Sequence, residues 1–232
     1  MADEARKAAI TGAFGALGSV VARTAAARGW RVALIDSAPA SAAPADLAKG
    51  GLVLAGVDLT DAADAQQAVA AARDGLGGLD ALINIAGGFR WTTLEDSDHS
   101  VWEFLFRINV LTAANAARAA LPALKASGRG RVVNVGAGAT EHAAAGMGPY
   151  AASKAGVCKL TESLAAELKD AGVTVNAVLP SIIDTPANRA DMPKADFTRW
   201  VSPAELAEVM LFLASDAAAA VTGALVRVPG RV

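Results

Sequence analysis

The chain has 232 residues and a formal net charge of −2, with 21 Lys and Arg residues against 23 Asp and Glu residues. This balance excludes the strongly basic surface that is typical of nucleic-acid-binding proteins, and it gives no reason to expect an anionic membrane as a partner. Alanine inflates the apolar share of 53%, and no apolar run reaches the length of about 18 residues that predicts a membrane span.

The organisation of the chain indicates one domain over residues 1–232, because there is no proline-rich or serine-rich linker, no charge run and no repeat. Asp3 and Glu4 lead directly into the first apolar run, which leaves no room for a secretory signal peptide, so a cytoplasmic location is expected. Cys158 is the only cysteine and has no metal-ligand partner at a useful spacing. We interpret it as a small buried apolar residue and expect no metal site.

Short apolar runs alternate along the chain with longer, alanine-rich amphipathic segments. The expected strands are 8–11, 31–35, 52–55, 81–85, 131–135, 173–179 and 225–228, and the expected helices are 17–28, 62–75, 101–127, 150–171 and 203–215. The apolar character of the strands is continuous rather than alternating, which indicates burial on both faces. We therefore predict a single-domain, Rossmann-type α/β fold, a doubly wound parallel sheet of about seven strands with helices on both faces.

Three glycines, Gly12, Gly15 and Gly18, connect the first expected strand to the first expected helix. Such a turn lets the backbone approach a phosphate while the helix N-terminus presents its amides to the negative charge, although a plain strand-to-helix turn is the alternative. Asp36 ends the second strand, where a carboxylate can accept both adenosine ribose hydroxyls and would repel a 2′-phosphate. Because no Lys or Arg stands in the glycine turn or directly after Asp36, the sequence predicts NAD(H) over NADP(H).

Two further patterns bear on the site. Asp58 and Leu59 follow the third strand and are predicted to contact the adenine, with Thr60 or Asp61 as the cap of the next helix. Tyr150 and Lys154 are four residues apart, so that the phenol and the ammonium share one face of a helix.

These motifs together resemble the short-chain dehydrogenase/reductase family over nearly the whole chain. The resemblance rests on 11–18 as the cofactor turn, 84–87 as the Asn-Asn-Ala-Gly element, Asn109 in the active-site helix, Tyr150 with Lys154, Pro180 with Thr185, and the turn at 222–223. It implies that Tyr150 is the general acid and base, that Lys154 lowers the phenol pKa and binds the nicotinamide ribose, and that Asn109 holds a proton-relaying water. For Asn109, a polar residue at a helix kink is the alternative.

The same resemblance implies a set of residues that bind the dinucleotide. They are Gly12, Phe14, Gly15, Ala16, Leu17, Gly18, Asp36, Asp58, Leu59, Asn84, Ala86, Gly87, Tyr150, Lys154, Pro180, Ile183 and Thr185. Segment 181–203 is expected to form a substrate lid, and Phe89, Ala137, Met147 and Trp200 are expected to line the substrate pocket. Trp91 and Trp200 packing within the lid is an equal alternative.

The chain departs from the family pattern at three positions. Ala16 replaces a glycine of the cofactor turn, Ser181 replaces the glycine after Pro180, and Ala137 stands where the family has its catalytic serine. Loss of one such donor commonly costs on the order of a hundredfold in rate. Thr140 or His142 could supply a donor, but both are more simply interpreted as loop residues.

A substrate that needs little polarisation, such as a quinonoid imine, is the other explanation for the missing serine. Segment 179–200 and Phe89 after 86–88 are similar to the corresponding parts of dihydropteridine reductase, a branch that also lacks the serine. We therefore expect an NADH-dependent oxidoreductase acting on a small-molecule carbonyl, alcohol or C=N group. A quinonoid dihydropteridine reductase and a non-catalytic dinucleotide-binding sensor are the alternatives. The helices 101–127 and 150–171 form dimer surfaces in the family, so a homotetramer or homodimer is expected.

Overall fold

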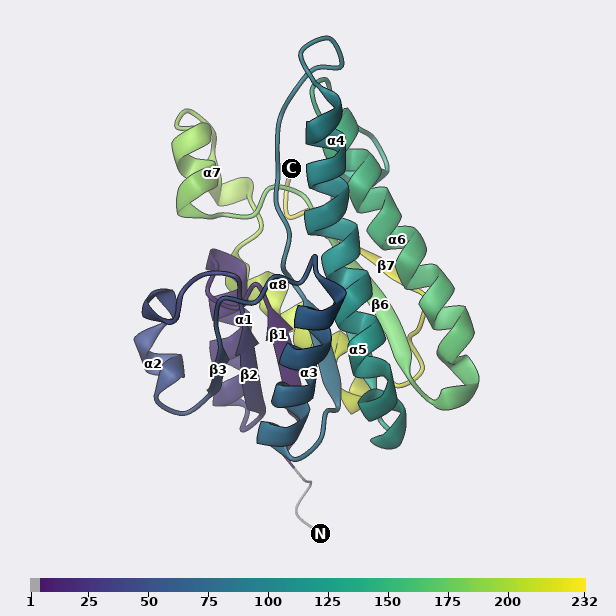
Figure 1. The fold of residues 1–232 in the computed structure, drawn as a ribbon. Coiled ribbons are helices and arrows are strands. Elements are labelled where there is room, and N and C mark those ends of the chain that lie inside the picture. Colours follow the sequence, from purple (N-terminus) through teal and green to yellow (C-terminus); the bar gives the residue numbers. More distant parts are fainter. Residues whose placement is uncertain (1–4) are drawn as a thin grey trace.

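The computed structural model describes residues 5–232, so the expectation drawn from Asp3 and Glu4 lies outside the described residues. These residues form one parallel sheet in the strand order β3-β2-β1-β4-β5-β6-β7 (Figure 1). The strands are β1 (Lys7–Thr11), β2 (Arg31–Ile35), β3 (Leu52–Leu54), β4 (Ala81–Asn84), β5 (Arg131–Val135), β6 (Thr174–Pro180) and β7 (Leu225–Val228). The predicted Rossmann-type fold is confirmed. The strand order reverses at β1, which opens a crevice at the carboxyl ends of β1 and β4.

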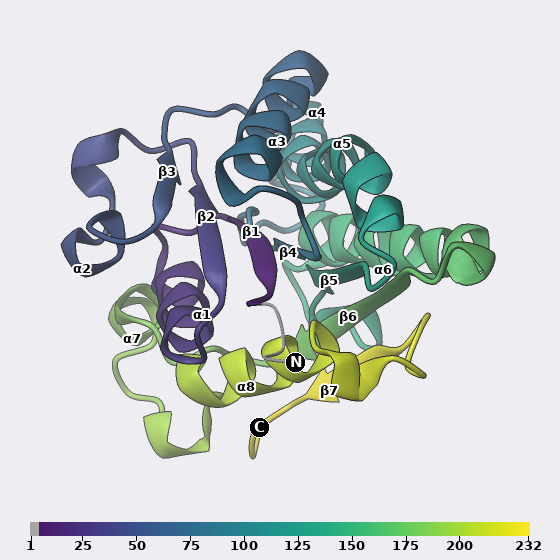
Figure 2. The ribbon, with the colours of Figure 1, turned by 90° about the horizontal axis from the view of Figure 1, so that it is seen from below.

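Helices cover both faces of the sheet, as Figure 2 shows from below. One face carries α1 (Ala16–Ala27) and α8 (Pro203–Leu213), and the other carries α3 (Ala62–Leu76), α5 (Thr112–Ala126) and α6 (Gly148–Leu168). The remaining helices are α2 (Ala45–Ala48), α4 (His99–Phe106) and α7 (Pro186–Asp191), with 3-10 turns at Ala40–Ala42, Gly138–Thr140, Lys169–Ala171, Phe197–Arg199 and Asp216–Ala218. Within residues 5–232, no helix combines the length and the apolar character that crossing a bilayer requires.

Local sequence signals explain where most of these helices begin and end. Ser202 and Glu205 form a reciprocal capping box at the start of α8, with Pro203 in its first turn. Gly29 follows α1 with a φ of 79°, a left-handed conformation that glycine adopts without strain. Asp61 rather than Thr60 caps α3, since its side chain accepts hydrogen bonds from the amides of two residues in the first turn.

The expected helix 101–127 is interrupted in the structure. It begins at His99, because Asp98 caps α4, and it passes through a π-helical segment at Arg107–Leu111 before continuing as α5. Inserted π turns are rare and are frequently found at functional sites. The short helices α2 and α7 were not predicted, since four or six residues carry too little periodicity to be recognised.

Candidate active site

The glycine turn after β1 has a geometry that only glycine allows at two positions. Gly12 has a φ of 64°, and a Cβ atom there would lie 2.8 Å from the amide nitrogen of Ala86. A Cβ atom at Gly18 would overlap the carbonyl oxygen of Gly12. The turn therefore brings the start of α1 against the β1 backbone. Gly15 caps α1 without a side chain, so the first amides of the helix remain available to an anionic group.

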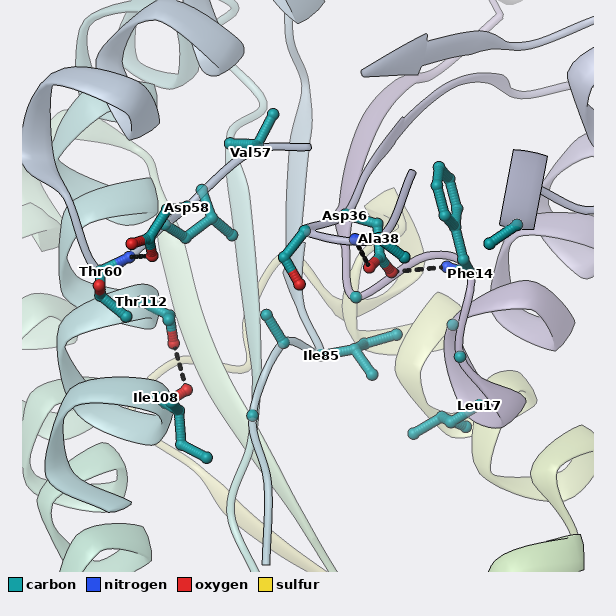
Figure 3. A pocket seen from close by; sticks show the side chains of 18 of the residues that line it. Phe14, Leu17, Asp36, Ala38, Val57, Asp58, Thr60, Ile85, Ile108 and Thr112 are labelled. Atoms are coloured by element: carbon teal, nitrogen blue, oxygen red, sulfur yellow. Dashed lines mark hydrogen bonds between the residues drawn. The ribbon is translucent and has the colours of Figure 1, made fainter. Parts of the chain in front are cut away.

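A cavity of about 560 Å³ lies beside this turn, at the carboxyl ends of the strands. Figure 3 shows Phe14, Leu17 and Asp36 on one side of it, with Asp58, Thr60, Ile108 and Thr112 on the other. Residues predicted to bind the cofactor that line this cavity are Gly12, Phe14, Gly15, Ala16, Leu17, Gly18, Asp36, Asp58, Leu59, Ala86 and Gly87. The lining also includes Ser37, Ala38, Ala42, Val57, Thr60, Ile85, Ile108 and Thr112.

Carboxylates lie on both sides of the cavity. The Asp36 carboxylate accepts hydrogen bonds from the amides of Phe14 at 2.9 Å and Ala38 at 3.0 Å, which fixes it against the glycine turn (Figure 3). Hydrogen bonds from Thr60 lower the pKa of Asp58, and the nearby Arg107 guanidinium adds to this effect. The cavity thus combines free helix amides, which suit a pyrophosphate, with carboxylates that accept hydroxyl or amine donors. This combination fits a dinucleotide.

Two buried polar side chains shape the cavity from behind. The Thr11 hydroxyl accepts hydrogen bonds from the amides of Ile85 at 3.0 Å and Ala86 at 3.2 Å, a role that the sequence did not predict. Asn84, which was predicted to bind the cofactor, does not line the cavity; its amide donates to the side-chain oxygen of Asn134 at 2.9 Å, which joins β4 to β5. Both residues belong to motifs that the sequence identifies, but their hydrogen-bond partners are visible only in the structure.

Tyr150 and Lys154 occupy successive turns at the start of α6. The Lys154 ammonium is buried and donates to the carbonyl oxygen of Val135 at 2.8 Å. Burial lowers the pKa of Lys154 to about 8, and burial raises the pKa of Tyr150 to about 12. Both shifts have the same cause, the cost of holding a charge away from water. The Phe89 ring lies edge-on to the Tyr150 ring, with centroids 4.9 Å apart and an interplanar angle of 84°.

Asn109 lies in the π-helical segment and fixes the loop after β4 against α6. Its side-chain oxygen accepts from the Gly88 amide at 3.0 Å, and its amide donates to the Gly88 carbonyl at 3.1 Å and to the Ser153 hydroxyl at 3.0 Å. A Cβ atom at Gly87 would lie 2.5 Å from the Asn109 side-chain oxygen and 3.4 Å from the Lys154 nitrogen. Gly87 therefore lets Asn109 and Lys154 lie directly beside the cofactor cavity, which Gly87 lines.

The position of the missing serine holds a buried alanine, Ala137. The hydroxyl of Thr140 donates to the Ala137 carbonyl at 2.8 Å, so its proton is already used within the loop. His142 is exposed on the same loop. Neither side chain takes the place of the serine in this conformation.

Segment 181–203, the expected lid, is held both by its own residues and by the C-terminal residues 228–231; the Ser181 hydroxyl, for example, donates to the Pro229 carbonyl at 2.7 Å. The Thr185 hydroxyl accepts from the Asn188 amide at 3.2 Å and thereby caps α7. Asp184 and Arg189 form a bidentate ion pair at 2.5 and 2.7 Å. Trp200 is buried and packs against Phe197 with centroids 4.8 Å apart. These contacts correspond to the lid-packing alternative for Trp200, and Pro180, Ile183 and Thr185 do not line the cavity of Figure 3.

Comparison with known proteins agrees with this geometry. Residues 6–196 match the short chain dehydrogenase family. The chain belongs to the short-chain dehydrogenase family. It is 33% identical to 2-(S)-hydroxypropyl-CoM dehydrogenase 3 of Xanthobacter autotrophicus, with 96% of this chain and 94% of the relative covered. It is 35% identical to a galactitol 2-dehydrogenase of Cereibacter sphaeroides (96% and 93% covered) and 31% identical to a 3-oxoacyl-[acyl-carrier-protein] reductase of Vibrio cholerae (98% and 97% covered).

As a short-chain dehydrogenase, the chain is an oxidoreductase, and this family uses nicotinamide cofactors. The resemblance drawn from the motifs of the sequence is thereby confirmed at the level of the family. Residues 5–232 contain no group of three or more His, Cys, Asp or Glu side chains arranged to hold a metal ion.

Proposed function

We propose that this short-chain dehydrogenase is an NAD(H)-dependent enzyme acting on a carbonyl, alcohol or C=N group, with Tyr150 as general acid and base. The observation that carries the proposal is the placement of the catalytic candidates beside the dinucleotide-sized cavity. Asn109 and Lys154 lie against Gly87, which lines that cavity, and Tyr150 precedes Lys154 by one turn of α6 and contacts Phe89. The relatives support the reaction class, since their names describe dehydrogenases of hydroxyl compounds and a reductase of an oxoacyl group.

The side chains of the site have distinct roles in this proposal. A nicotinamide, when bound, supplies or accepts the hydride. The Tyr150 phenol gives its proton to the substrate oxygen during reduction and takes it back during oxidation. The pKa of Lys154 is about 8, so this side chain is mostly protonated at pH 7, and its charge favours the phenolate that remains after proton transfer. Asn109 positions the pair through Gly88 and Ser153, and the water relay implied by the resemblance remains a prediction.

Asp36 supports the preference for NAD(H) over NADP(H). Its half-buried carboxylate is fixed at the cavity wall by two backbone amides. A carboxylate held there can accept hydrogen bonds from ribose hydroxyls, whereas a 2′-phosphate would be repelled by its charge.

We also propose a homo-oligomer, a tetramer or a dimer, located in the cytoplasm. An apolar hollow of about 300 Å³ between α4 and α6 is lined by Trp102, Glu103, Phe106, Pro149, Ala152 and Ser153. Trp102 and Phe106 are exposed there, both on α4, which lies beside α6 in Figure 1. Exposed aromatic side chains of this kind mark association surfaces. Light scattering of the purified protein should give a mass well above the 23.3 kDa of one chain.

The first test of the proposed function is NADH oxidation by the purified protein with a quinonoid dihydropterin, generated in place, and with a panel of ketones and aldehydes. Turnover with any of these compounds supports an oxidoreductase, and rapid turnover with the pterin alone would favour the dihydropteridine reductase alternative. That alternative is favoured by one observation, the absence of a side-chain donor at Ala137. NADH binding without turnover of any compound would instead support a sensor.

A further inference from the structure

We propose that the substrate is a flat, uncharged cyclic compound whose reacting carbonyl is activated by a neighbouring electron-withdrawing group, and that Phe89 and Trp91 select it. This inference deepens the proposed function and rests on it. It rests on three observations: aromatic side chains on the two loops that flank Tyr150, charged side chains near these loops that already have partners within the protein, and the absence of a side-chain hydrogen-bond donor at Ala137.

Phe89 is the first of these aromatic side chains. It stands in the loop after β4 and packs its ring edge-on against Tyr150, the residue that meets the substrate oxygen. Yet 44% of Phe89 remains exposed. Aromatic rings pair well with other aromatic rings in edge-on or offset arrangements. A flat ring whose oxygen reaches the phenol would therefore contact the uncovered part of Phe89.

Trp91 fastens the same loop to the loop that precedes α6. Its indole nitrogen donates to the Ala145 carbonyl at 3.1 Å, and the Thr92 amide donates to the Gly146 carbonyl at 2.9 Å. Gly146 has a φ of 75°, and a Cβ atom there would overlap the Trp91 ring. The indole thus lies directly on the Gly146 backbone, while 61% of Trp91 is exposed. The two loops beside Tyr150 form one aromatic-lined unit.

Several charged side chains of this unit are already engaged elsewhere. The Arg90 guanidinium lies 5.1 Å from the centre of the Phe104 ring, on α4. Glu141 is paired with Arg227 of β7 at 3.0 Å. Lys154, the cation nearest Tyr150 on α6, donates to the Val135 carbonyl. Binding of a carboxylate or phosphate substrate usually depends on an available arginine or lysine, so these contacts favour an uncharged substrate.

The buried methyl group of Ala137 offers no hydrogen bond to a substrate oxygen. A side-chain hydroxyl at this position would share the developing negative charge with Tyr150, and the Thr140 hydroxyl already donates to the Ala137 carbonyl. Without a second donor, the reaction favours a carbonyl that is already electron-poor because of a neighbouring electron-withdrawing group. Flatness, lack of charge and electronic activation occur together in cyclic compounds that carry two adjacent carbonyl groups fused to an aromatic ring.

The test compares three ketones: isatin, which is flat and activated, cyclohexanone, which is neither, and acetoacetate, which is charged. We expect kcat/KM for isatin to exceed the other two by about a hundredfold, the effect assigned to one missing donor. Phe89→Leu should raise the KM for isatin about tenfold, since it removes a ring contact. Phe212→Leu is the matched control, because Phe212 is also a partly exposed aromatic residue but lies on α8, away from Tyr150 and from the two loops.

A binding measurement makes the test independent of turnover. Calorimetric titration of isatin into the enzyme saturated with NAD+ should show binding that Phe89→Leu and Trp91→Leu weaken about tenfold and Phe212→Leu does not. Equal kcat/KM for isatin and cyclohexanone, or equal isatin binding by the Phe89 and Phe212 variants, would overturn the inference and leave the proposed function standing. Absence of turnover with these ketones, with aldehydes and with the pterin would contradict the proposed function, and the calorimetric result would still decide whether Phe89 and Trp91 bind a flat ring.

Discussion

Replacing Asp36 by Asn tests the cofactor preference, because it removes one charge and keeps a side-chain oxygen that can accept from the Phe14 or the Ala38 amide. Two unit charges 4 Å apart repel by about 1 kcal/mol in water and by about 4 kcal/mol near a protein surface. A doubly charged 2′-phosphate beside Asp36 should therefore weaken the binding free energy of NADPH by about 2 kcal/mol or more, which corresponds to roughly 30-fold in affinity. Asp36→Asn should remove this penalty. It should also weaken NADH about tenfold, since a charged acceptor for the ribose is lost.

The assay is a fluorescence titration of wild type and variant with NADH and with NADPH, at equal ionic strength. We expect the ratio of the two dissociation constants to change by about two orders of magnitude in favour of NADPH. Asp58→Asn is the matched control, since it removes an exposed carboxylate from the other side of the same cavity and should weaken both cofactors equally. Equal affinities in the wild type, or an unchanged ratio in Asp36→Asn, would refute the reasoning.

Three other predictions follow from particular contacts. Gly18→Ala places a methyl group 2.8 Å from the Ala13 Cα, so we expect the free energy of unfolding, measured by thermal denaturation, to fall by about 1 to 3 kcal/mol. Gly50→Ala is the control, because no atom lies within 4 Å of the added methyl group, and it should leave stability nearly unchanged. The pKa of Lys154 falls from 10.5 to about 8 on burial. Between about pH 8 and pH 10.5 the unfolded chain therefore binds more protons at this residue than the folded chain does. The free energy of unfolding should rise with pH over this range, by up to about 3 kcal/mol from Lys154. Urea unfolding at pH 8 and pH 10 should show this rise in wild type and not in Lys154→Met, and equal slopes would contradict it. Ala137→Ser should raise kcat/KM for an unactivated ketone about tenfold or more, since it restores a hydrogen-bond donor. Ala139→Ser is the control. Equal kcat/KM in the two variants would show that the site does not lack a donor at position 137.

The fold was predictable because its signals are local. Continuous apolar runs identify strands that are covered on both faces, and the strand-to-helix glycines identify the edge at which a ligand binds. Gly12 and Gly18 require conformations or contacts that no other residue allows, so their spacing already carried structural information. Tyr150 and Lys154 share a helix face for the same reason, since a spacing of four residues is a property of the helix itself.

The parts that sequence analysis missed depend on long-range contacts. The π-helical segment at Arg107–Leu111 keeps helical periodicity in the sequence, and the hydrogen bonds of Asn109 to Gly88 are visible only in space. Thr11 is a short polar residue at a strand end, and its bonds to Ile85 and Ala86 join segments more than seventy residues apart. The packing of Trp200 on Phe197 depends on how the lid folds on itself. The identity of Trp200 as a tryptophan therefore did not show whether it packs within segment 181–203 or lines the substrate pocket.

Tyr150→Phe removes only the phenol oxygen that is proposed to transfer the proton. The phenol oxygen accepts and donates no hydrogen bond within residues 5–232 as described, and the edge-on contact with Phe89 needs only the ring, so this substitution should leave the site intact. We expect kcat with the best substrate of the ketone, aldehyde and pterin panel to fall by about a thousandfold, with the NADH dissociation constant within about twofold of wild type. Unchanged turnover in Tyr150→Phe would contradict the account, because the proton would then come from another group.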